Sequence, residues 1–184
     1  MASPKPRRDW LYLAGIGMQL MGMLIMDLVP FYPASLWEPP SSPLHALVSL
    51  RASYVSRSGD PYMDAALDAH EPWFRLFLYV EGLVQLPLAA YLVYQLASSR
   101  RASGPAELAA LVFGCVTAMN ASVCCFELWH MGPDRLSPRY KTTQLYGTYL
   151  PFAVIPAVMA VDMYLRLLPR VRGDSYVEAK KKRS

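Results

Sequence analysis

Four apolar stretches divide the chain, and each is long enough to cross the hydrocarbon core of a bilayer as a helix. Crossing takes roughly 20 helical residues, at about 1.5 Å of rise each. The stretches cover residues 10–29, 73–97, 106–129 and 144–168. A soluble four-helix bundle would carry a polar stripe along each helix, and none is visible in residues 11–26 or 83–94. The pattern predicts an all-α integral membrane protein, a single bundle of four transmembrane helices.

The segment between the first two spans, about residues 30–72, is too polar to cross the membrane and too long for a simple linker. Prolines at its start prevent the first helix from continuing. Apolar residues then recur at helical spacing from Leu44 to Leu50, which predicts a short amphipathic helix. We expect this segment to form a lid over the lumenal end of the bundle. Residues 1–9 are predicted to be a cytosolic N-terminus, residues 10–168 the membrane domain, and residues 169–184 a basic cytosolic tail.

The distribution of charge orients this bundle. With both termini in the cytosol, that side carries twelve basic residues and the opposite side six, counted along the chain. This asymmetry satisfies the positive-inside rule. The net charge of +4 therefore reflects topology, and since no folded module presents a basic face, a nucleic-acid partner is excluded.

The C-terminal tail predicts the cellular compartment of the protein. Lys181 and Lys182 occupy the fourth and third positions from the end of the sequence, the dilysine pattern that retrieves membrane proteins to the endoplasmic reticulum. Such a signal is read by a receptor and works only on a cytosolic tail. The alternative is a basic flank that attracts anionic lipid, and both can hold together. We expect a multi-pass protein of the endoplasmic-reticulum membrane.

A carboxyl group inside a span is the most informative feature of the sequence. A carboxylate at the bilayer centre costs several kcal/mol unless it is paired, protonated or facing a wet cavity. Glu81 lies roughly 13 Å deep in the second span; Gln85 follows one turn later, and Pro87 frees a backbone carbonyl nearby. Together they predict an inward polar patch. The alternative, a hydrogen-bonded group that only fixes helix packing, stays open.

The other spans contribute further candidates. Asp27 closes the first span, the third contains Asn120, and the fourth contains Tyr146 and Tyr149, whose i,i+3 spacing puts them on one face of an α-helix. Asp162, one turn before Arg166, is interpreted as an interfacial ion pair. The three cysteines lack metal-ligand spacing with a histidine, so neither a metal nor another cofactor is expected.

The order of short motifs along the chain resembles a known family. The motifs are Ile25-Met26-Asp27-Leu28, Gly59-Asp60-Pro61, Pro72-Trp73-Phe74, Val80-Glu81-Gly82-Leu83-Val84-Gln85-Leu86-Pro87 and Tyr146-Gly147-Thr148-Tyr149-Leu150-Pro151. In order and spacing they resemble the EXPERA superfamily, and within it the sigma-2 receptor branch. The resemblance covers nearly the whole chain, from about Trp10 to Leu168, with departures in the third span and in the loop after the first.

The resemblance implies a bundle of the emopamil-binding protein type with an enclosed lipid or ligand cavity. Asp27 would pair with a ligand amine, Asp60 would hydrogen-bond to Asp27, and Glu81, Gln85 and Tyr149 would line the pocket. Sterols, oxysterols or cationic amphiphiles would be the ligands, with a role in sterol homeostasis or trafficking. A homodimer and an association with sterol transporters are further partner hypotheses.

Two other functions stay open at this point. The superfamily also contains sterol Δ8–Δ7 isomerases, and the pocket carboxylates would supply the acid and base that this reaction needs. In that branch a histidine lies one turn before the first-span carboxylate, whereas this chain has Met23 there; we therefore expect a protein that is not an enzyme. The other alternative is a scaffold or regulator of membrane proteins or mitochondrial precursors.

Overall fold

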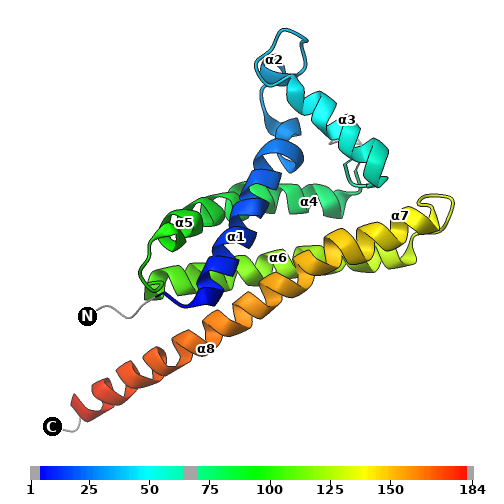
Figure 1. Ribbon diagram of the computed structural model, residues 1–184. Helices are drawn as coiled ribbons and strands as arrows, with labels where there is room; N and C mark the ends of the chain where they lie inside the picture. The colour runs from blue at the N-terminus through cyan, green and yellow to red at the C-terminus, as the bar shows by residue number, and fades with distance from the viewer. Residues whose placement is uncertain (1–4, 64–69, 182–184) are drawn as a thin grey trace.

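Four long helices build the computed structural model, which describes residues 5–63 and 70–181 (Figure 1). The helices that are long and apolar enough to span a membrane are Arg7–Asp27, Pro72–Ala97, Gly104–His130 and Pro138–Gly173. The prediction of a four-helix membrane bundle is therefore confirmed. The fourth helix begins at Pro138, six residues before the predicted span at residue 144. Proline is favoured in the first turn of a helix, and the residues of this turn are mostly polar, so a search for apolar stretches does not find them.

Three of the four spans change helix type along their length. The first consists of α1 (Arg7–Gly22) and η1 (Met23–Asp27), and the second of α4 (Pro72–Val80), η4 (Glu81–Gln85) and α5 (Leu86–Ala97). The third is α6 (Gly104–His130) alone, and the fourth joins α7 (Pro138–Thr143), η5 (Gln144–Tyr149) and α8 (Leu150–Lys181). The segments η1, η4 and η5 are π-helical.

The segment after the first span contains a 3₁₀ turn, η2 (Val29–Phe31), and two helices, α2 (Ala34–Trp37) and α3 (Ala46–Ser58). The helix predicted from the spacing of Leu44 to Leu50 is thus present as α3. It lies at the end of the bundle opposite the chain termini (Figure 1). We call this the α3 end and the other the terminal end. The function of the segment as a lid stays a prediction.

α6 and α8 pack side by side along much of their length, whereas α1 lies against α5 (Figure 1). Gly114 permits the close approach of α6 to α8, because a Cβ atom there would lie 2.7 Å from the Pro156 backbone oxygen. Small residues at such crossings are typical of membrane helices, whose association depends on close packing.

Two apolar cores lie one behind the other along the bundle. The core at the terminal end includes Ala89, Phe113 and Met159, and the core at the α3 end includes Leu78 and Leu145. Along the second and fourth spans, the candidate residues fall between these two sets in the sequence. The site is therefore a polar layer between two apolar layers.

Buried charges at the terminal end have partners. Arg166 contacts fully buried Asp9 at 2.7 Å and Asp162 at 2.5 Å, and Arg8 contacts Asp162 at 2.8 Å. The predicted Asp162–Arg166 pair is thus present, within a larger network that joins α1 to α8. Glu107, also fully buried, contacts the Arg170 guanidinium at 2.9 Å.

The predicted retrieval signal falls largely outside the described residues. The backbone of α8 is helical as far as Lys181, while Lys182 lies beyond the described range. The signal stays a prediction.

Candidate functional site

The three π-helical segments contain most of the candidate residues. π-helices are rare and occur frequently at functional sites. Each segment is followed within three residues by a proline, which lacks the N–H that an α-helix would need there. The candidates that these segments hold are Asp27 in η1, Glu81 and Gln85 in η4, and Tyr146 and Tyr149 in η5.

Asp60 joins the site from the loop after α3. It follows Gly59, which ends α3 in the left-handed conformation with φ of 61° and donates its N–H to the Val55 carbonyl. The Asp60 side chain is only 1% exposed. This turn directs the carboxyl group inward against the fourth span.

Hydrogen-bond donors from α3, the following loop and the fourth span hold the Asp60 carboxyl group. The Tyr54 hydroxyl donates at 2.9 Å, the Tyr62 backbone N–H at 2.9 Å and the Tyr149 hydroxyl at 3.1 Å. Burial raises the pKa of Asp60 above its ordinary value, although these hydrogen bonds act in the opposite direction. Burial and the neighbouring Asp60 raise the pKa of Tyr54 to about 12, so its hydroxyl stays a donor at neutral pH.

Asp27 and Glu81 complete an acidic cluster with Asp60. The charges of Asp27 and Asp60 interact, as do those of Glu81 and Asp27. Arg51 from α3 is the nearby cation, since its charge interacts with Asp27; burial nonetheless lowers the pKa of the Arg51 guanidinium. Its Nη2 donates to the Met63 carbonyl at 3.4 Å.

The cluster differs from the buried acids at the terminal end. Among the side chains that the structure describes, those of residues 5–63 and 70–173, no basic group lies within 4.0 Å of a carboxyl oxygen of Asp27, Asp60 or Glu81. Residues 64–69 add no basic side chain in sequence. Three carboxyl groups thus share a low-dielectric space without a cation in direct contact.

Gln85 belongs to a second polar group, nearer the terminal end. Its side-chain oxygen accepts hydrogen bonds from the Thr117 hydroxyl at 2.8 Å and from Gln19 Nε2 at 3.3 Å. Gln19 was not predicted as a site residue. Its signal in the sequence is an amide in the middle of an apolar span, a common means of joining membrane helices.

The remaining candidates lie in different surroundings. The Asn120 side-chain oxygen is buried and has no hydrogen-bond donor among the described residues. Tyr146 is 55% exposed, whereas Tyr149 contacts Asp60. The expectation that both tyrosines share one face assumed an α-helix, and the wider turn of η5 changes their angular separation. A role for Tyr146 and Asn120 in ligand binding stays a prediction.

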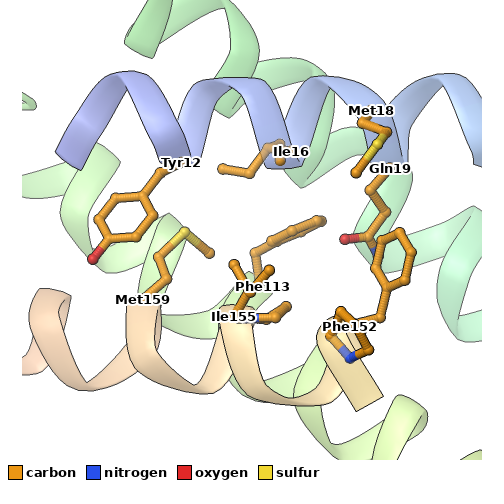
Figure 2. Close-up of a pocket in the computed structure, with 11 residues that line it drawn as sticks. Tyr12, Ile16, Met18, Gln19, Phe113, Phe152, Ile155 and Met159 are labelled. Atoms are coloured by element: carbon orange, nitrogen blue, oxygen red, sulfur yellow. The ribbon is translucent and has the colours of Figure 1, made fainter. Parts of the chain in front are cut away.

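An apolar groove runs between α1 and α8 (Figure 2). Ile16 and Phe113 contribute to its walls, Tyr12 lies at one end, and Gln19 at the other with Phe152 (Figure 2). Its cavity volume is about 70 Å³. Gln19 therefore belongs both to this groove and to the polar group around Gln85.

The chemistry that this arrangement can perform is recognition of a cation or a hydrogen-bond donor. Carboxylates accept, and in a low-dielectric space their attraction for a cation is strong. Tyrosine rings such as that of Tyr149 add cation–π contact. Within the described side chains of residues 5–63 and 70–173, no group of three acidic, cysteine or histidine residues has the arrangement of a metal site.

Comparison with known proteins gives one match. The family model described as EXPERA, the expanded EBP superfamily, matches residues 46–163. The matched region covers well over half of the chain. It contains Asp60, the candidates of the second span and those of the fourth span, but it begins after Asp27. No curated protein matches the chain.

Proposed function

The chain belongs to the EXPERA superfamily, and from this premise we propose that it binds sterols, oxysterols or hydrophobic amines in the cluster of Asp27, Asp60 and Glu81. The superfamily includes both sterol-binding members and isomerases. The observation that carries the proposal is the lack of a basic side chain in contact with three neighbouring carboxyl groups, of which Asp60 is buried and Asp27 and Glu81 are half-buried. A ligand ammonium would supply that charge, and its attraction would be poorly screened.

The cellular role that we propose is sterol homeostasis or trafficking at the endoplasmic reticulum, with both termini in the cytosol. The excess of basic residues on the terminal side supports this orientation. Membership of the sigma-2 receptor branch is part of the same proposal. It is supported by Met23, which is fully buried at the position of the isomerase histidine.

Competition between two ligands tests this function. The purified protein in lipid nanodiscs should bind a radiolabelled oxysterol saturably, and a hydrophobic tertiary amine should displace it, because both would occupy one pocket. Empty nanodiscs measure partition of the sterol into lipid. Binding that never saturates above this background would contradict the proposal.

An isomerase is the second candidate, favoured by the contact of the Tyr149 hydroxyl with Asp60 beside two more acids. Such a group could deliver and remove a proton. Incubation with a Δ8 sterol, followed by chromatography and mass spectrometry, separates the candidates. We expect no shifted double bond above the level of a preparation carrying Asp60→Asn; clear turnover that the variant loses would assign catalysis.

A further inference from the structure

The groove between α1 and α8 begins next to the acidic cluster. A Cβ atom on Gly22 would lie 3.9 Å from the Asp27 carboxylate oxygen, and Gln19 precedes Gly22 by three residues. On the fourth span, Pro151 lines the groove two residues after Tyr149. The near end of the groove thus lies about one helical turn, or roughly 5.4 Å, from groups on both sides of the cluster.

The enclosed space of the groove is small. Its cavity volume is about 70 Å³, and a water-sized group needs roughly 10–15 Å³ of such space. A methylene is of similar size, so about five to seven carbon atoms fit in a row. An unbranched alkyl chain fits within this space, whereas the four rings of a sterol would extend beyond it.

The polar end of the groove presents an acceptor. Gln19 directs its amide hydrogens to Gln85 and Thr117, and in Figure 2 its side-chain oxygen points toward the space between the helices. A ligand that carries N–H donors therefore meets an acceptor between the acids and the groove. A ligand with a carboxylate head would face only acceptors, the Gln19 oxygen and the carboxyl groups of the cluster, and would be repelled.

We propose that this groove binds the tail of an amine ligand, and that the amines which the cluster accepts include long-chain, unbranched alkyl amines. The ammonium would lie at Asp27, and the tail would pass Gln19 toward Tyr12. This inference rests on the proposed function, because it takes the cluster as the site of the head. From Gly22 to Tyr12 the helix rises about 15 Å, which an extended chain of roughly twelve carbons covers, since its bonds are about 1.5 Å long and zigzag.

Gly15 offers a substitution that fills the groove without disturbing the fold. It lines the groove, and a Cβ atom there would have no neighbouring atom within 4 Å. Gly15→Leu would therefore occupy the space of the tail. Gly17→Leu is the matched control, since it lies on the same helix, does not line the groove and has equally open surroundings.

The test measures binding of n-dodecylamine and n-hexylamine to the three proteins in nanodiscs. Gly15→Leu should weaken binding of n-dodecylamine at least tenfold, or roughly 1.4 kcal/mol, relative to Gly17→Leu. Binding of n-hexylamine should be equal in both, because a chain of six carbons ends before Gly15. Equal binding of n-dodecylamine to both variants would overturn the tail assignment.

A separate variant distinguishes this failure from failure of the proposed function. Asp27→Asn should weaken binding of both amines by roughly 100-fold. If both amines bind this variant as they bind the wild type, the head site and the proposed function fail. If Asp27→Asn weakens binding to this extent while Gly15→Leu and Gly17→Leu behave alike, only the alkyl tail assignment fails.

Discussion

Asp27→Asn is expected to weaken binding of a hydrophobic amine by roughly 100-fold, equivalent to about 2.7 kcal/mol. Asparagine keeps the shape of the side chain and removes its charge. Loss of one partner from a buried, hydrogen-bonded charge pair typically costs about 2–5 kcal/mol of binding. Equilibrium titration of a tertiary amine into nanodisc-embedded protein measures the effect.

Glu127→Gln is the matched control, because it makes the same chemical change on a partly exposed acid that contacts Arg135 at 3.5 Å. It should bind the amine as the wild type does. Asp27→Asn should also unfold at the same temperature as the wild type or a higher one, since it removes one of three neighbouring carboxyl groups that have no basic side chain in contact. Unchanged amine affinity in Asp27→Asn would rule out Asp27 as the anchor.

Gly59→Ala is expected to destabilise the protein by about 3 kcal/mol. The left-handed conformation costs a residue with a Cβ atom roughly 1–2 kcal/mol. In addition, that Cβ atom would lie 2.5 Å from Cδ2 of the Tyr140 ring, and such overpacking costs about 1–3 kcal/mol. Denaturant unfolding in detergent, followed by circular dichroism, measures the change.

Two further variants separate the causes of this effect. Without the Tyr140 ring the clash is absent. Adding Gly59→Ala to Tyr140→Ala should therefore cost less stability than Gly59→Ala costs the wild type, and the difference measures the clash. Gly132→Ala is the control, because a Cβ atom there has no neighbour within 4 Å and Gly132 lacks a positive φ. If Gly59→Ala were as stable as Gly132→Ala, the turn would not position Asp60 as described.

The spans could be predicted from the sequence because the bilayer leaves the chain few alternatives. Every backbone N–H and C=O within it must be paired internally, so a long apolar stretch has to be helical. The apolar pattern did not reveal the start of the fourth helix, where Arg139 and Lys141 are polar but helical. Asp9 was missed for a related reason: burial of an acid near a helix end depends on Arg166, which lies far along the chain.

The candidate site was predictable in part. Glu81 and Gln85 are conspicuous as polar residues in an apolar span. The spacing of apolar residues does not, however, predict that this segment is π-helical. The signal for the π-helix is the proline two or three residues later, as with Pro87. Asp60 was predicted as a site residue only from the resemblance to a family, because the sequence does not show that an acid in a loop contacts Tyr149.

We infer that the carboxyl groups of Asp27, Asp60 and Glu81, none of which has a basic side chain in direct contact, form one cation-binding pocket. Comparing the affinity of the wild-type protein for a hydrophobic tertiary amine with that for its neutral carbon isostere tests it most directly. The two ligands differ only at the head, so the difference in affinity, each corrected for partition into empty nanodiscs, reports the charge at the head. We predict saturable amine binding at least roughly tenfold tighter than that of the isostere. Equal affinities for the two ligands would contradict the account.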